Sequence, residues 1–450
     1  MSIFNRSAFS ALLVSALVLS LSSPANAVDE TASPTPSPSE TAVPVDPNLC
    51  SAKTAISQSA LGKFYGYVVD VTTGKILLNI NGDEATPSAS VLKVLSVSAA
   101  LTHLPATYTA TTRVLTVPEE PGTIVLQGGG DHTLSNMTKG SYTTYAKPAR
   151  LETLANQVLN GWKSAEPITK IILDASFFKG DTYNPYWYSS DRTNGYISHI
   201  TGLQVDSDRA NGDQTSYAYS GYRSTDPVLR TGTLFKSALK GLAPKAVLVK
   251  GKTPKTAVEL TAVKSQPMTT WMSHAIGISD NTETEFIARH AAKAAGLSPA
   301  FTSIEPMVKS MLNNLGIDSS KLVMKDASGL AQANRVTPKM ITELMVKVAQ
   351  GTTGLTALES YLPVAGVGPG SMGGRFTGKN AVARKFVKGK TGFIPGLYSL
   401  AGIINAKDGS RLAYSIFARS ADGKQVGWST RGALDTVATR FYSCGAKLGL

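Results

Sequence analysis

The stretch PSASVLKVLSVSAALTHL, residues 87–104, decides the fold. After Pro87, the run from Ser90 to Leu104 has a helical pattern, and Ser90 and Lys93 share one face of that helix, with Cβ atoms roughly 5–6 Å apart. A serine hydroxyl is a poor nucleophile until a neighbouring base takes its proton, and lysine is such a base where its surroundings favour the neutral amine. The N–H groups at the helix N-terminus would face a developing oxyanion. Alone, however, Ser-x-x-Lys is a common chance match, for which a surface serine and a solvated lysine are the ordinary explanation.

The segments around this helix predict an α+β fold. A hairpin is expected from Phe64–Asp70 and Ile76–Ile80, and sheet returns near the C-terminus. Strands at both ends with a helical middle indicate one domain whose two ends share an antiparallel sheet flanked by helices. The central region has short strands, many Gly, Tyr, Thr and Asp residues, and few helices, which predicts a large inserted, strand-rich domain. The expected division is a catalytic domain at 50–104 and 261–450, with the inserted domain at 105–260.

Two further motifs suit the same chemistry. Ser279-Asp280-Asn281 interrupts the helical pattern between two predicted helices, so its side chains can face a cleft. An ordinary helix cap would explain these residues equally well. Lys390-Thr391-Gly392 ends a predicted strand, where a lysine and a hydroxyl suit a carboxylate and Gly392 permits close backbone approach. A basic edge strand that resists aggregation is the alternative for this motif.

Together and in this order, the three motifs are the set found in class A β-lactamases and penicillin-binding proteins. The sequence resembles the class C low-molecular-mass penicillin-binding proteins, which are D-alanyl-D-alanine carboxypeptidases and endopeptidases of peptidoglycan. The resemblance covers roughly residues 55–445 and implies a penicillin-binding/β-lactamase-like fold. Further stretches that match this family are Leu126–Asp131, Asp326–Leu330, Asn334–Pro338, Gly374-Arg375-Phe376 and Ser399–Gly402.

The resemblance implies a role for each motif residue. Ser90 is acylated, Lys93 is the base, and Ser279 and Asn281 move the proton and hold the peptide. Lys390 and Thr391 bind the terminal carboxylate of the substrate, and Gly392 belongs to the same substrate-binding motif. The backbone N–H groups of Ser90 and Phe393 form the oxyanion hole. The family uses no cofactor or metal; its partners are peptidoglycan stem peptides and acylating β-lactam inhibitors. Two departures stand out: Phe393 replaces a smaller or polar residue, and Ala327 replaces a glycine.

The ends of the chain indicate export. Residues 1–27 combine Arg6, an apolar stretch and Ala25-Asn26-Ala27, the pattern of a cleaved signal peptide, and no later stretch is apolar enough to span a membrane. Residues 28–49 are rich in Pro, Ser and Thr and predict a disordered linker. Cys50 and Cys444, the two cysteines of the chain, flank the whole fold, so export favours a disulfide between them over two free thiols. The net charge of +13 suits an anionic cell wall, and no nucleic-acid motif is present.

Three questions remain open at this level. A β-lactamase needs a glutamate to activate water, and Glu152 is a near match, although a helix of the inserted domain explains it better. A non-catalytic wall-binding protein with the same fold is the second alternative, against which the three intact motifs argue. The balance of carboxypeptidase and endopeptidase activity is undecided. Within the inserted domain, Asp174 and Asp181 are candidates for pairing with a free ammonium of the stem peptide.

Overall fold

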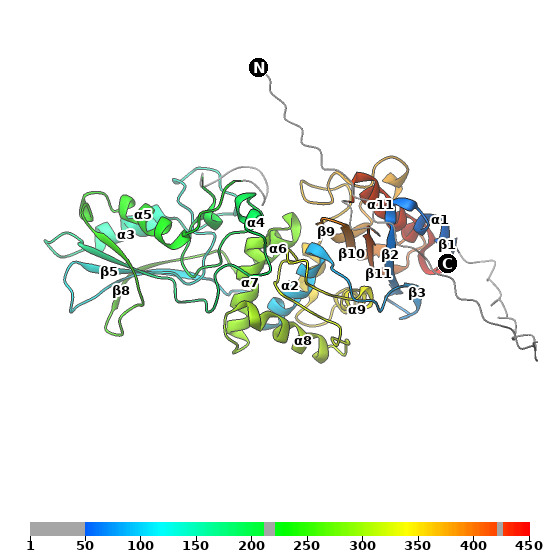
Figure 1. The fold of residues 1–450 in the computed structure, drawn as a ribbon, viewed down its shortest axis with the longest axis horizontal. Helices are drawn as coiled ribbons and strands as arrows, with labels where there is room; N and C mark the ends of the chain where they lie inside the picture. Colours follow the sequence, from blue (N-terminus) through cyan, green and yellow to red (C-terminus); the bar gives the residue numbers. More distant parts are fainter. Residues whose placement is uncertain (1–49, 211–220, 421–425) are drawn as a thin grey trace, which may run out of the picture. The chain divides into compact units, whose positions relative to one another are not determined.

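A computed structural model describes residues 50–210, 221–420 and 426–450 (Figure 1). The predicted signal peptide at 1–27 and the predicted linker at 28–49 lie outside these residues. Over the described ranges, no helix has the length and apolar character needed to cross a membrane.

The two ends of the chain build one antiparallel layer, as predicted. Strands β9 (Val387–Ile394), β10 (Leu397–Asn405) and β11 (Arg411–Arg419) pair in the order β11-β10-β9. The hairpin of β2 (Lys63–Asp70) and β3 (Ile76–Ile80) lies beside β11. β10 and β11 contain few polar residues and are buried along nearly their whole length. Both faces of this part of the sheet are therefore covered.

A helical layer packs against this sheet and surrounds α2 (Lys93–His103). The first eight residues of α2 are all buried, which is the pattern of a helix in the centre of a core. Its neighbours are α6 (Met268–Ile278), α7 (Asn281–Ala294), α8 (Ile304–Asn314) and α9 (Pro338–Ala349), with the short α10 (Thr356–Tyr361) alongside. Lys93 of the nucleophile motif is thus the first residue of a helix that is buried in the core.

The region between α2 and α6 forms a separate five-stranded sheet in the order β7-β6-β5-β4-β8. Its pairs β5–β6 and β6–β7 are parallel and its other pairs antiparallel. Helices α3 and α5 contact each other and lie on the same face of this sheet (Figure 1). The bounds are β4 Thr111–Thr116, β5 Thr123–Gln127, α3 Leu151–Gly161, β6 Lys170–Asp174, α4 Ser189–Thr193, α5 Pro227–Ala238, β7 Val247–Lys250 and β8 Val258–Lys264.

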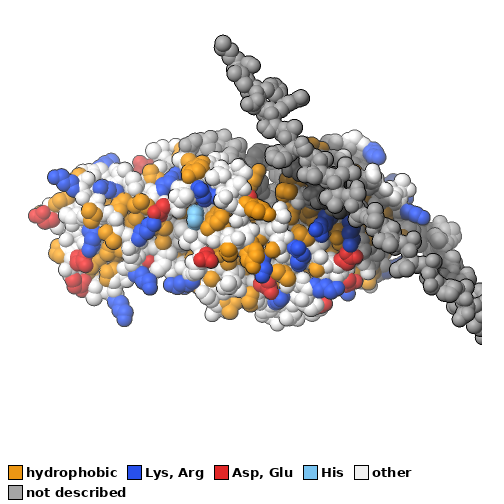
Figure 2. Space-filling view, in the orientation of Figure 1, with side chains coloured by type: hydrophobic (Ala, Val, Ile, Leu, Met, Phe, Trp, Pro, Cys, Tyr) orange, Lys and Arg blue, Asp and Glu red, His pale blue; other side chains and the backbone are white. Residues whose placement is uncertain are grey.

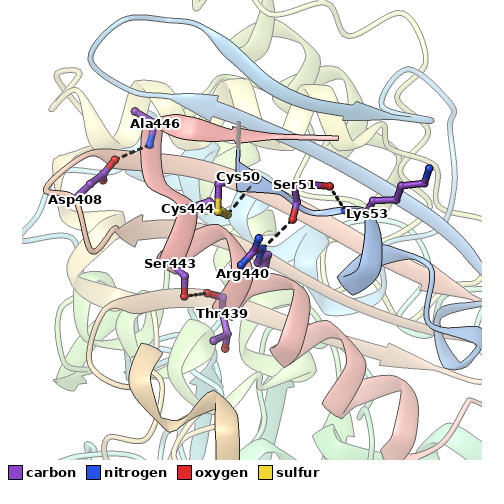
Figure 3. Close-up of a disulfide and its surroundings, with 9 residues drawn as sticks. All are labelled: Cys50, Ser51, Lys53, Asp408, Thr439, Arg440, Ser443, Cys444 and Ala446. Atoms are coloured by element: carbon purple, nitrogen blue, oxygen red, sulfur yellow. Dashed lines mark hydrogen bonds between the residues drawn. A yellow bond between two sulfur atoms is a disulfide. The ribbon is translucent and has the colours of Figure 1, made fainter. Parts of the chain in front are cut away.

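A disulfide and a short parallel strand pair link the first described residues to the C-terminal helix and strand. Cys50 in β1 (Cys50–Ser51) forms a disulfide with Cys444 at the end of α11 (Trp428–Cys444), with the Cα atoms 5.3 Å apart (Figure 3). Strand β1 pairs in parallel with β12 (Leu448–Gly449), and Arg440 Nε donates to the carbonyl of Ser51 at 2.9 Å. The predicted disulfide is therefore present.

Within residues 50–210, 221–420 and 426–450, the remaining elements are one short α-helix and seven 3-10 turns. Their bounds are α1 Lys53–Ile56, η1 Ser59–Leu61, η2 Ala89–Leu92, η3 Asp206–Asp208, η4 Lys240–Leu242, η5 Phe301–Ser303, η6 Gly378–Ala383 and η7 Gly445–Lys447. One of them changes the predicted helix over 90–104: residues 89–92 form a 3-10 turn, and the α-helix begins only at Lys93. Figure 2 shows Lys and Arg side chains scattered over the visible face among acidic and apolar ones, without a single basic patch.

Candidate active site

The predicted nucleophile lies on a tight turn between the sheet and the central helix. Ser90 is the second residue of η2, and Ala89 before it has a positive φ of 47°, an uncommon conformation for a residue with a side chain. Gly329 holds this turn from outside, because a Cβ atom there would collide with the carbonyl oxygen of Ala89. The turn brings Ser90 Oγ within 3.0 Å of Lys93 Nζ.

Lys93 is fully buried, and its ammonium nitrogen has three neighbours. Besides Ser90 Oγ, Nζ donates to Asn281 Oδ1 at 2.7 Å and to the carbonyl of Ser328 at 2.6 Å. Burial lowers the pKa of Lys93 from 10.5 to about 8, although the carboxylates of Asp326, Glu285 and Asp280 oppose the shift. A substantial fraction of Lys93 is therefore neutral near pH 8.

The second motif forms the turn between α6 and α7. Ser279 closes α6 in the left-handed region at φ 67°, and the side chain of Asp280 caps α7 by accepting from the Glu283 N–H at 3.0 Å. Asn281 Nδ2 donates to the carbonyl of Tyr196 at 3.1 Å. This bond fixes the amide orientation that directs Oδ1 toward Lys93.

The third motif lies on β9, the edge strand next to η2, but in the middle of the strand. The prediction that it ends a strand was wrong, because pairing with β10 continues as far as Ile394. Lys390 is fully buried, and its Nζ donates to Ser279 Oγ at 2.8 Å and to the carbonyl of Thr391 at 2.9 Å. Burial, together with the nearby positive charge of Lys93, holds the pKa of Lys390 well below 10.5. At Gly392, a Cβ atom would lie 2.6 Å from the carbonyl oxygen of Ser88, so only glycine lets this strand approach the nucleophile turn.

These three motifs meet at one cleft of about 1080 Å³. The predicted residues that line it are Ser90, Ser279, Asn281, Thr391, Gly392 and Phe393. Lys93 and Lys390 lie behind this wall, bonded to Ser90 and Ser279 respectively. Aromatic side chains of Tyr188, Tyr196, Phe393, Tyr398 and Trp428 also line the cleft. The site therefore combines two buried amines, of Lys93 and Lys390, with three hydroxyls and an amide that line the groove.

The loop between α8 and α9 that contains Ala327 and Ser328 supports Lys93. This loop is held by an acidic residue that the sequence analysis did not predict. Glu285 is fully buried, and its carboxylate accepts from the backbone N–H groups of Ala327 at 3.0 Å and Ser328 at 2.8 Å. The loop thereby presents the Ser328 carbonyl to Lys93. Burial raises the pKa of Glu285 to about 8, and Asp326 adds to that shift. The position of Glu285, one helical turn after Asn281 on the same helix face, was the signal that could have identified it.

Three acidic residues considered in the sequence lie elsewhere. Asp174 is tied by its side chain to Thr253 and Ser176, and neither Asp174 nor Asp181 is among the residues that line the cleft, so their contact with a stem peptide stays a prediction that the cleft does not support. Glu152 lies exposed on α3 and also does not line the cleft, which removes the basis for a β-lactamase water activator. Among the described residues of the inserted region, the acidic residue that does line the cleft is Asp191, in α4.

Comparison with known proteins identifies the family. The model of the D-Ala-D-Ala carboxypeptidase 3 (S13) family matches residues 51–221 and 212–441. A carboxypeptidase DacB of Mycolicibacterium smegmatis is 33% identical over 396 residues, which cover 87% of this chain and 83% of the relative. The chain belongs to the S13 family of D-Ala-D-Ala carboxypeptidases. This confirms the predicted class, a serine-type D-Ala-D-Ala carboxypeptidase of the low-molecular-mass class C penicillin-binding proteins.

Solved structures share the fold. Penicillin binding protein 4 (dacB) from Haemophilus influenzae aligns with a TM-score of 0.71 at 18% identity and covers 87% of this chain and 98% of its own. The same protein complexed with a novel β-lactam aligns with a TM-score of 0.64 at 19% identity over the same shares. The predicted fold class, a penicillin-binding domain with a large insertion, is confirmed.

Proposed function

We propose that this chain removes the terminal D-alanine from peptidoglycan stem peptides through an acyl-enzyme on Ser90. The observation that carries the proposal is the bonding of Lys93. A neutral amine has two N–H groups and one lone pair, and two of the three neighbours of Lys93, the amide oxygen of Asn281 and the carbonyl of Ser328, can only accept. The lone pair is then left for the third neighbour, the Ser90 hydroxyl at 3.0 Å.

Acylation follows from this arrangement. Lys93 takes the Ser90 proton as Oγ attacks the carbonyl of the penultimate D-alanine, and the oxyanion forms beside the backbone N–H groups of Ser90 and Phe393. The proton on Lys93 then reaches the leaving amine through the Ser279 hydroxyl, and free D-alanine departs. Water hydrolyses the ester with Lys93 again as base, which restores the Ser90 hydroxyl.

The third motif would bind the terminal carboxylate of the substrate. Thr391 lines the cleft, and Lys390 lies behind Ser279 with a pKa that burial depresses. A substrate carboxylate at this place would favour the charged form of Lys390 and accept from the Thr391 hydroxyl. β-Lactams carry a carboxylate beside their reactive carbonyl, so the same residues would orient them for acylation.

We further propose that the protein acts outside the cytoplasm and that residues 105–260 form its inserted domain.

The test is release of D-alanine from a synthetic stem pentapeptide that ends in D-Ala-D-Ala. The wild-type protein should release D-alanine, and Ser90→Ala should release none while it melts at the same temperature. A peptide that ends in D-Ala-L-Ala serves as the control substrate. Turnover that persists in Ser90→Ala, or a folded wild-type protein without turnover, would rule out this function. A cross-linked muropeptide dimer assayed in parallel measures endopeptidase activity.

A further inference from the structure

A buried polar cluster joins the inserted region to the second motif. The Tyr145 hydroxyl donates to Asp280 Oδ2 at 3.0 Å. Arg209, of which 1% is exposed, donates from Nη1 to the Tyr145 hydroxyl at 2.9 Å and reaches Asp280 Oδ2 with Nη2 at 3.4 Å. On the other side, Asp280 Oδ1 accepts the N–H of Glu283. Asp280 is therefore held between α7 and two side chains of the inserted region.

The residues on either side of Asp280, Ser279 and Asn281, both belong to the candidate active site. Ser279 has a left-handed backbone, a conformation that is strained for a non-glycine residue and persists only when its surroundings hold it. Asn281 directs its amide oxygen to Lys93 at 2.7 Å. A carboxylate fixed between these residues keeps the Ser279 hydroxyl on Lys390 and the Asn281 oxygen on Lys93.

The charges of the cluster are already balanced by protein groups. The ligating atoms of His274, Asp280 and Glu283 lie within 4.8 Å of one another, a spacing that a metal ion could use. Arg209, however, supplies a positive charge at Asp280, and His274 Nδ1 bonds to Glu283 Oε2 at 2.6 Å. Burial alone would raise the pKa of Asp280, but the charge of Arg209 helps to lower it below its usual value. The carboxylate of Asp280 therefore stays charged. An ion-pair network that fixes Asp280 accounts for this cluster without a metal ligand.

We propose that Arg209 and Tyr145 are positioning residues for acylation: the inserted region completes the active site by holding Asp280. This inference rests on the proposed acyl-enzyme at Ser90. Neither side chain touches the cleft, so their loss should slow bond formation more than it weakens binding. The inserted region would then be required for catalysis, in addition to any part it plays in substrate selection.

Stopped-flow acylation by a fluorescent penicillin separates an effect on bond formation from an effect on binding. It gives the first-order acylation constant k2 at saturation and the dissociation constant Kd of the preceding complex. Tyr145→Phe removes one bond to a carboxylate and should lower k2 about tenfold. Arg209→Met leaves a buried carboxylate without its cation and should lower k2 about a hundredfold, whereas Arg209→Lys should recover part of the loss. Kd should stay within about twofold in each variant.

The matched control lies in the same inserted region but away from the motif. Thr253→Val removes the bond from Thr253 Oγ1 to Asp174 Oδ2 (2.5 Å) and should leave k2 unchanged. Folded Tyr145→Phe and Arg209→Lys proteins with wild-type k2 would overturn the inference, even if Arg209→Met does not fold. A Thr253→Val loss equal to that of Tyr145→Phe would also overturn it. A wild-type protein that forms no adduct would instead overturn the proposed function on which the inference rests.

Discussion

Replacing Asn281 by aspartate should displace the pH dependence of acylation, because it puts a negative charge beside Lys93. In the wild-type protein the pKa of Lys93 is about 8, and the Asn281 oxygen lies 2.7 Å from Nζ. With charge centres about 4 Å apart and an effective dielectric constant of about 20, Coulomb's law gives roughly 4 kcal/mol, or about three pKa units. Burial of the new carboxylate opposes part of this gain, so we expect an upward shift of about two units.

The acylation constant measured from pH 6 to 10.5 reports this shift directly. The wild-type constant should rise about tenfold per pH unit and level off above about 8 as Lys93 loses its proton. In Asn281→Asp the plateau should begin near pH 10, so that the rate at pH 7.5 falls about 75-fold and recovers at high pH. Asn194→Asp, which adds the same charge elsewhere on the cleft wall, is the control and should keep the wild-type profile. A uniform loss of rate in Asn281→Asp, with the rise still near pH 8, would refute Lys93 as the base.

Three further predictions follow from the cleft and the chain ends. Thr391→Val should lower kcat/KM for D-Ala-D-Ala peptides about tenfold or more without changing the melting temperature, since it removes one bond to a carboxylate; equal rates would exclude Thr391 from binding. Asp191→Asn should lower kcat/KM about threefold for stem peptides with a free side-chain ammonium but not for acetylated ones, and identical preferences would exclude that contact. Replacing Cys50 and Cys444 by serine should lower the free energy of unfolding in urea by up to about 6 kcal/mol, as the disulfide closes a loop of nearly the whole fold. An unchanged unfolding midpoint would contradict the last expectation.

The parts predictable from sequence are those whose signal is local. The nucleophile turn, the interhelical turn and the middle of β9 each carry their reactive residues within three or four positions, so the three motifs and their order in the chain indicated Ser90, Ser279 and Lys390 together. The alternating strands at the two ends predicted the shared sheet for the same reason. The 3-10 turn at Ser90 could not be predicted, because contacts of η2 with β9 and the loop at Gly329 decide its geometry.

The contacts of the inserted region were not predictable from the sequence. Arg209 meets Asp280 across 71 residues, and no periodic pattern connects the two positions. For a similar reason the sequence did not single out Asp191, which lines the cleft, over Asp174 and Asp181, which do not. Asp174 ends β6 and Asp191 lies in α4, and only the path of the chain shows that α4 borders the cleft while Asp174 binds Thr253. Long-range pairing, which local spacing does not encode, determines both outcomes.

Mass mapping of the penicillin adduct tests the central claim most directly. The protein is labelled with penicillin, digested with a protease, and the modified peptide is sequenced by tandem mass spectrometry. One adduct on Ser90, absent from Ser90→Ala, is the predicted result, because Ser90 lies both in the cleft and within 3.0 Å of Lys93 Nζ. An adduct on another residue, or undiminished labelling of Ser90→Ala, would contradict the account.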